Sequence, residues 1–169
     1  REGDLLARRQ AFQRDPLARQ AFLQALGVFP DPQARLISLF AYENTGLASW
    51  LSALSAGHRA THLLVPQGRI MADLLHWLDV EALSPGTVER RGTLTVQALP
   101  FVRQEDYDRI VWSCDFNAVR GEDSFVRAQW AARPMLWHIY QQEEDAHWVK
   151  LKAFLALYIN GLSPAAAQA

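Results

Sequence analysis

Short apolar runs alternate with longer amphipathic segments from residue 35 onward. The runs that predict buried strands are residues 36–42, 61–65, 94–99, 109–113 and 135–139. Apolar runs of this length, bounded by Gly, Pro or polar residues, are typical of strands that are covered on both faces. Because helical patterns separate most of the runs, we predict an α/β fold: a Rossmann-like parallel sheet with helices on both faces.

The segments between the runs carry apolar residues at three- and four-residue spacing. They predict helices over residues 46–56, 69–78, 124–131 and 146–160. The polar residues 84–92 and the segment around Arg120 are expected to form loops.

Two further helical patterns precede the first strand, over residues 5–12 and 17–26. Asp15-Pro16 separates them, and Pro30-Asp31-Pro32 follows, a sequence that breaks regular structure. We therefore expect residues 1–33 to form lead-in helices and an interdomain linker, and residues 34–169 to form the sheet domain.

Composition narrows the class of protein. The chain has 169 residues, of which 50% are hydrophobic and 21% charged, as in a globular domain. A net charge of −1, with no basic stripe interleaved with aromatics, argues against direct contact with nucleic acid. No apolar run approaches the ~18 residues of a membrane span. Cys114, expected in a core strand, has no second cysteine to pair with, which favours a reducing cytoplasm.

Several familiar motifs are absent from the sequence. No Gly-x-Gly-x-x-Gly follows the first strand, and no Gly-Lys-Ser/Thr loop occurs, so neither a standard dinucleotide site nor a P-loop is expected. Asp106-Tyr107-Asp108 has the carboxylate spacing of metal-dependent sugar transferases, but it precedes its expected strand. His58 and His62 straddle a loop and a strand. We expect neither a metal nor a cofactor.

The segment Arg120-Gly121-Glu122-Asp123-Ser124 follows an apolar run and opens a helix. Unpaired amides at a helix start bind anions, and a guanidinium presents a fork that suits phosphate oxygens. Two carboxylates beside such a site would accept hydrogen bonds from sugar hydroxyls. The plain alternative is an N-cap Asp or Ser with solvated neighbours.

Other unusual residues follow the carboxyl ends of the expected strands, where ligands bind in parallel sheets. The Gln104 amide offers a donor and an acceptor to a pyrimidine edge, which the Phe101 backbone would also reach. Phe40 and Tyr42 would stack on a base or sugar, although core packing is equally open for Phe40. The candidate substrate-binding residues are Phe40, Tyr42, Phe101, Val102, Arg103, Gln104, Arg120, Gly121, Asp123, Ser124 and Tyr140, and Glu122 lies among them, facing the group that the diphosphate carries. Together they suit a nucleoside diphosphate that carries a sugar.

Four stretches resemble the elongation factor P arginine rhamnosyltransferase family, and they keep that family's order and spacing. They are Phe40–Asn44, Leu99–Asp108, Arg120–Trp130 and Trp137–Tyr140. The resemblance implies the C-terminal half of a GT-B glycosyltransferase, which transfers rhamnose with inversion from TDP-rhamnose to an arginine of elongation factor P in the cytoplasm. It implies Phe40, Tyr42, Gln104, Arg120, Asp123, Ser124 and Tyr140 in the donor site, with Glu122 needed for catalysis.

Part of the family pattern is missing. The family begins with an N-terminal domain whose aspartate acts as general base, and this chain resembles the family only from the point where that domain ends. Gln141 stands where Pro is expected, and residues 165–169 do not resemble the family. A guanidinium stays protonated at any working pH and is a poor nucleophile until a carboxylate positions it and takes a proton, so the chain alone is expected to bind TDP-rhamnose but to transfer little or no sugar. The alternatives are a non-catalytic α/β nucleotide-binding or protein-docking module, and a transferase for another nucleotide sugar.

Overall fold

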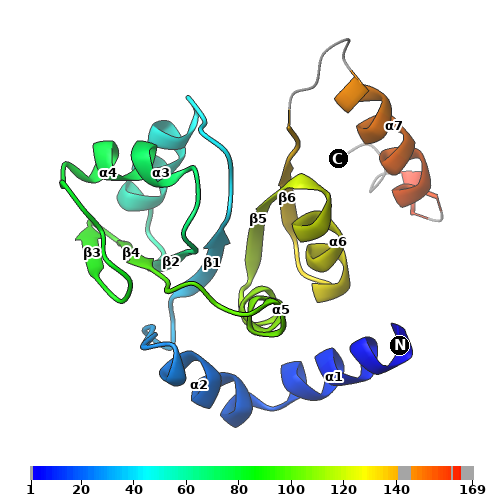
Figure 1. Cartoon of the computed structure of the whole chain (residues 1–169), viewed down its shortest axis with the longest axis horizontal. Coiled ribbons are helices and arrows are strands. Elements are labelled where there is room, and N and C mark those ends of the chain that lie inside the picture. Colours follow the sequence, from blue (N-terminus) through cyan, green and yellow to red (C-terminus); the bar gives the residue numbers. More distant parts are fainter. Residues whose placement is uncertain (1, 141–145, 161, 165–169) are drawn as a thin grey trace. The chain divides into compact units, whose positions relative to one another are not determined.

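The computed structural model describes residues 2–140, 146–160 and 162–164, in two compact units, Arg1–His138 and Ile139–Ala169. The first unit holds a six-stranded sheet in the order β3-β4-β2-β1-β5-β6 (Figure 1). Only β3 runs antiparallel to its neighbour, which confirms the predicted, mostly parallel α/β sheet. The strands are β1 (Arg35–Leu39), β2 (Thr61–Val65), β3 (Val88–Arg91), β4 (Leu94–Ala98), β5 (Phe116–Arg120) and β6 (Met135–His138).

The predicted helices over residues 46–56, 69–78, 124–131 and 146–160 are confirmed with small shifts of their ends. The helices of the first unit are α1 (Glu2–Arg14), α2 (Pro16–Ala25), α3 (Leu47–Ala56), α4 (Met71–Leu78), α5 (Gln104–Ser113) and α6 (Gly121–Ala131). In the second unit, the described residues form α7 (Ala146–Tyr158).

Helices cover both faces of the central strands. Successive β1 residues point to opposite faces: Ile37 packs in a core with Leu51 of α3 and Leu74 of α4, whereas Leu36 packs with Leu23 of α2 and Ile110 of α5. Figure 1 shows the same arrangement, with α3 and α4 on one side of the sheet and α2 and α5 on the other. Each buried Leu or Ile contributes about 1.5–3 kcal/mol to folding.

The lead-in helices pack on α5 within the first unit. The rings of Phe12 and Trp112 lie 5.9 Å apart, and Arg19 donates from Nε and Nη2 to the Ser113 carbonyl at 2.9 and 2.8 Å. These contacts fix the C-terminal end of α5. Its N-terminal end lies at the site described below.

The prediction for residues 109–113 is wrong: they form the second half of α5, not a strand. Ile110 and Val111 are both buried, but in two different cores, as adjacent residues on the inner side of a helix can be. Cys114 follows this helix and is buried, although it is not in a strand. Asp106-Tyr107-Asp108 consequently lies inside a helix and does not precede a strand.

Two strands arise in segments that were expected to form loops. β5 was not predicted because Asn117 interrupts its apolar pattern. Asn117 is fully buried, and its side-chain Nδ2 donates to the Val111 carbonyl at 3.0 Å, which satisfies that donor. β3 has the sequence Val88-Glu89-Arg90-Arg91 and lies at the sheet edge, where polar side chains are tolerated.

Candidate functional site

The chain passes from β5 into α6 without an intervening loop. Arg120 ends the strand and occupies the N-cap position, and Gly121 begins the helix with φ +59°. This left-handed conformation is strained for any residue with a Cβ atom. A Cβ at Gly121 would also lie 3.4 Å from the hydroxyl of Tyr42. The turn thus depends on glycine for its backbone conformation.

Neighbouring side chains fix the first turn of α6. The Arg120 amide donates to Ser124 Oγ at 3.1 Å, and the Ser124 hydroxyl donates back to the Arg120 carbonyl. Trp137 donates from Nε1 to the Gly121 carbonyl at 3.0 Å and stacks on Phe125 with 3.9 Å between ring centroids. These hydrogen bonds use the backbone carbonyls of Arg120 and Gly121 and the backbone amide of Arg120. In the described residues, the Arg120 side chain makes no capping hydrogen bond to the turn.

Arg120 lies over two aromatic rings at the end of β1. Its guanidinium carbon is 4.3 Å from the Phe40 centroid and 5.0 Å from the Tyr42 centroid, within the range of cation–π attraction. Its Nη1 atom is buried and has no hydrogen-bond partner within the part of the chain that is described. An unpaired buried donor costs free energy, and the same side chain lines the pocket described next, so the Arg120 guanidinium is a strong candidate for binding an anion.

These residues line a pocket of about 530 Å³. It lies where the strand order reverses: β1 is flanked by β2 on one side and by β5 on the other. Phe40 and Tyr42 follow β1, Pro66 and Gln67 follow β2, Pro100 and Phe101 follow β4, and Arg120 ends β5. Such a switch point at the carboxyl ends of parallel strands is the usual ligand position in open α/β sheets.

The structure brings most of the predicted site residues together around this pocket. Those that line it are Phe40, Tyr42, Phe101, Val102, Gln104, Arg120, Gly121, Glu122, Asp123 and Ser124. Arg103 is the N-cap of α5 and does not line the pocket. Tyr140 belongs to the second unit, where its side chain is exposed.

Sequence reasoning missed Pro66, Gln67, Pro100 and Tyr107, which also line the pocket. The first three directly follow β2 and β4, so the carboxyl-end rule would have found them. Tyr107 was missed because the fold of its segment was wrongly predicted. Its ring lies edge-on to Phe40 at 5.7 Å, its buried Oη has no partner among the described residues, and burial raises its pKa. Tyr107 therefore remains a protonated hydrogen-bond donor.

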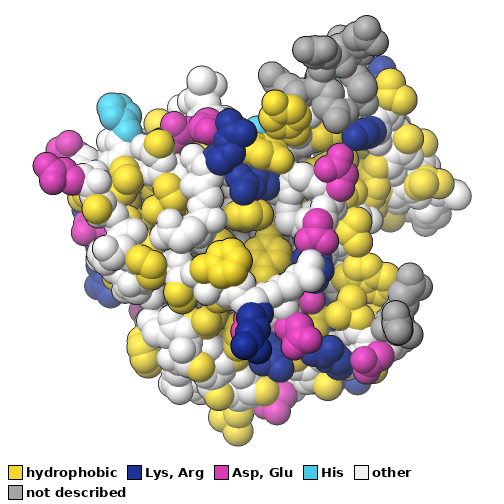
Figure 2. Space-filling view, viewed as in Figure 1, with side chains coloured by type: hydrophobic (Ala, Val, Ile, Leu, Met, Phe, Trp, Pro, Cys, Tyr) yellow, Lys and Arg dark blue, Asp and Glu magenta, His cyan; other side chains and the backbone are white. Residues whose placement is uncertain are grey.

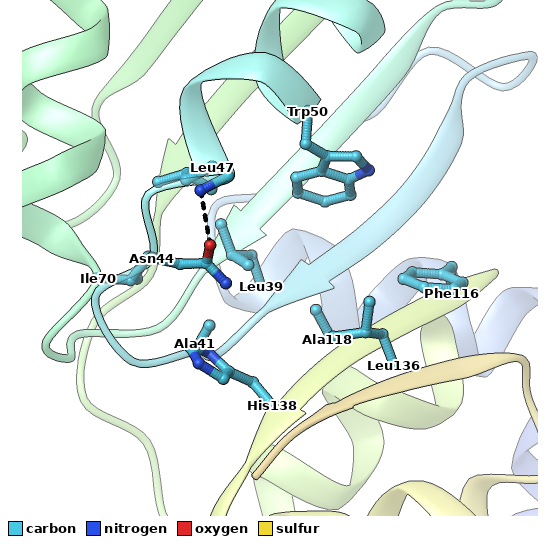
Figure 3. A pocket seen from close by; sticks show the side chains of 11 residues that line it. Leu39, Ala41, Asn44, Leu47, Trp50, Ile70, Phe116, Ala118, Leu136 and His138 are labelled. Atoms are coloured by element: carbon cyan, nitrogen blue, oxygen red, sulfur yellow. Dashed lines mark hydrogen bonds between the residues drawn. The ribbon is translucent and has the colours of Figure 1, made fainter. Parts of the chain in front are cut away.

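A second cavity, of about 250 Å³, lies beside α3 and is lined mainly by apolar side chains such as Leu39, Trp50 and Leu136 (Figure 3). His138 also lines it, edge-on to Tyr42 with ring centroids 5.5 Å apart, and burial lowers the pKa of His138. Among the residues that the structure describes, no Lys, Arg, Asp or Glu lines this cavity, so we take the pocket beside Arg120 as the candidate site.

The described residues contain no cluster of three or more His, Cys, Asp or Glu side chains placed to hold a metal ion. Asp108 pairs with Arg127 at 2.7 Å and Asp106 with Arg109 at 3.6 Å. On the face shown in Figure 2, basic and acidic side chains are interspersed. Within the described segments, every helix is too short or too polar to cross a membrane.

The fold and the pocket define the class of protein: a Rossmann-like α/β domain with a candidate ligand site at its topological switch point. The family model for "Elongation-Factor P (EF-P) rhamnosyltransferase EarP" matches residues 1–169, and the chain therefore belongs to the EarP family.

Relatives support this assignment. The chain is 65% identical over 163 residues to a protein-arginine rhamnosyltransferase of Pseudomonas putida and 57% identical over 162 residues to one of Pseudomonas aeruginosa. Each alignment covers 96% of this chain and 43% of the relative, so the chain spans less than half the length of these relatives.

A solved structure from work on the "structural basis for EarP-mediated arginine glycosylation of translation elongation factor EF-P" matches with a TM-score of 0.89 and 60% identity. The match covers 99% of this chain and 53% of the solved one. The fold is that of the C-terminal half of a GT-B glycosyltransferase, as predicted.

Proposed function

We propose that this chain is the donor-binding half of a protein-arginine rhamnosyltransferase that transfers rhamnose from TDP-rhamnose to an arginine of elongation factor P in the cytoplasm. The observation that carries the proposal is the Arg120 guanidinium, which lines the pocket beside the start of α6 and whose buried Nη1 has no partner in the described residues. We further propose residues 34–169 as the nucleotide-binding domain, with residues 1–33 as its lead-in and linker.

The pocket has the parts that such a donor requires. Arg120 and the first amides of α6 would hold the diphosphate, because guanidinium groups and helix starts both favour anions. Phe101 and Gln104, which also line the pocket, would contact the base. The family resemblance seen in the sequence also implies a place for Tyr140 in the donor site. Glu122 and Asp123 would then face the sugar.

In the proposed reaction, a nitrogen of the acceptor arginine attacks the anomeric carbon of rhamnose from the face opposite the diphosphate. The bond between that carbon and the diphosphate oxygen breaks, and its electron pair leaves with TDP. Arg120 and the helix start would stabilise the charge that develops on the leaving group. A carboxylate must also take the proton from the guanidinium; the family resemblance assigns this role to the N-terminal domain. The chain alone should therefore bind the donor but transfer little or no sugar.

Titration calorimetry of the chain with TDP tests this proposal. We expect saturable binding of TDP at sub-millimolar concentration and weaker binding of thymidine, because thymidine lacks the diphosphate. Uridine diphosphate serves as the matched comparison. Equal affinity for both diphosphates would favour a transferase for another nucleotide sugar. A folded sample that gives no heat with millimolar TDP would contradict the proposal and favour a protein-docking module.

A further inference from the structure

One guanidinium joins the pocket lining to the interior of the protein. Arg127 lies in α6, four residues after Asp123, and donates from Nε to Asp123 Oδ2 at 2.9 Å. The same side chain donates from Nη1 to Asp108 Oδ1 at 2.7 Å. Asp108 belongs to α5 and only 12% of its side chain is exposed, against 75% for Asp123. Arg127 thus links a buried carboxylate on one helix to an exposed carboxylate on another.

The charges of this group make the link strong. Although burial disfavours the Arg127 cation, its hydrogen bonds to Asp108 and Asp123 raise the pKa of Arg127, so it stays protonated. Hydrogen bonds between ionised partners are stronger than neutral ones, and partial burial weakens their screening by salt. Gln104 also donates from Nε2 to Asp123 Oδ2, at 3.5 Å. Asp123 is therefore held from α5 as well as from its own helix.

We propose that Arg127 is a positioning residue for the nucleotide site: anchored by Asp108, it holds Asp123 and the first turn of α6 in place against α5. The proposal rests on the function proposed above. A purely structural ion pair would need only the contact between Arg127 and Asp108. The second bond reaches a carboxylate that lines the pocket, three residues after Arg120 and on the same helix start. Through this bond Arg127 positions the part of the pocket lining that belongs to α6 relative to α5.

Three variants separate positioning from simple stabilisation. Arg127→Gln removes the link but leaves Asp108 as an unpaired buried charge, which lowers the melting temperature. The double variant Asp108→Asn/Arg127→Gln removes both charges, so its melting temperature should recover, while Asp123 is still released. Arg109→Gln is the matched control, because Arg109 makes an exposed ion pair on α5 with Asp106, at 3.6 Å.

Calorimetry with TDP and amide hydrogen exchange are measured on each variant. We expect Arg127→Gln and the double variant to bind TDP at least about tenfold more weakly, the effect of losing one charged hydrogen bond. Amides 124–127, the first that are bonded within α6, should exchange faster in both variants than in the unchanged chain. Arg109→Gln should change neither quantity.

The outcome that overturns the proposal is a double variant in which TDP affinity and exchange at residues 124–127 both return to the values of the unchanged chain. That result would make Arg127 a stabilising residue only. Unchanged exchange in both Arg127 variants would overturn it as well. If the unchanged chain fails to bind TDP, the proposed function fails, and the exchange rates still decide whether Arg127 holds the helix start.

Discussion

Replacing Arg120 by alanine is expected to weaken TDP binding by about 100-fold and thymidine binding by about threefold or less. One or two charged hydrogen bonds to phosphate contribute about 1.5–3 kcal/mol each, and every 1.4 kcal/mol is about tenfold in affinity. Thymidine lacks the diphosphate and loses only the general attraction of the site. Calorimetric titration of the chain and of Arg120→Ala with both ligands measures the two ratios.

Folding stability should change little in Arg120→Ala. The substitution removes a buried Nη1 that has no partner among the described residues, which is favourable, and it removes the contacts with Phe40 and Tyr42, which is unfavourable. Arg69→Ala is the matched control: the Arg69 guanidinium lies 5.7 Å from the Tyr42 ring but pairs with the exposed Glu43 and does not line the pocket. Equal losses for TDP and thymidine in Arg120→Ala would contradict a phosphate contact.

Replacing Gly121 by alanine is expected to weaken TDP binding by more than about tenfold. The left-handed conformation at φ +59° costs alanine about 1–2 kcal/mol, and relaxing it would turn the first amides of α6 away from the pocket. The new Cβ would also lie 3.4 Å from the Tyr42 hydroxyl, on the wall that the diphosphate would approach. The melting temperature should fall by about 2–8 °C, as expected for a destabilisation of this size.

Gly86→Ala provides the comparison for this effect. Gly86 has φ +85°, and a Cβ there would meet no atom within 4 Å. It carries a similar backbone penalty but does not line the pocket, so its melting temperature should fall while TDP affinity stays unchanged. If Gly121→Ala binds TDP as tightly as Gly86→Ala does, the start of α6 does not hold the diphosphate.

Periodicity predicted the elements whose environment is uniform. β1 and β2 are buried along nearly their whole length, so their apolar runs were easily recognised. α5 was predicted to be a strand and β5 to be a loop because their patterns mislead. Residues 109–113 look like a strand when taken alone, and the helical spacing appears only when Tyr107 is included. β5 contains Asn117, whose burial depends on a carbonyl from α5, a long-range contact that no local pattern shows.

Most residues proposed for the site from the sequence line one pocket, and their roles in binding stay predictions. Ligand-type residues after successive strands predicted the wall made by Phe40, Tyr42 and Arg120, and the structure places these three side chains together. The link from Arg127 to Asp108 was not predicted, because it requires that residue 108 lie on a helix beside α6. Residues 104–108 were assigned to the approach to a strand, so their side chains had no predicted neighbours.

The most direct test of the account is a crystal structure of the chain with TDP bound. We expect phosphate oxygens about 2.9 Å from nitrogens of the Arg120 guanidinium and from the first amides of α6, with the thymine beside Phe101 and Gln104. TDP bound elsewhere, for example in the apolar cavity beside α3, would contradict the assignment of the site. So would a complex in which the phosphates make no contact with Arg120.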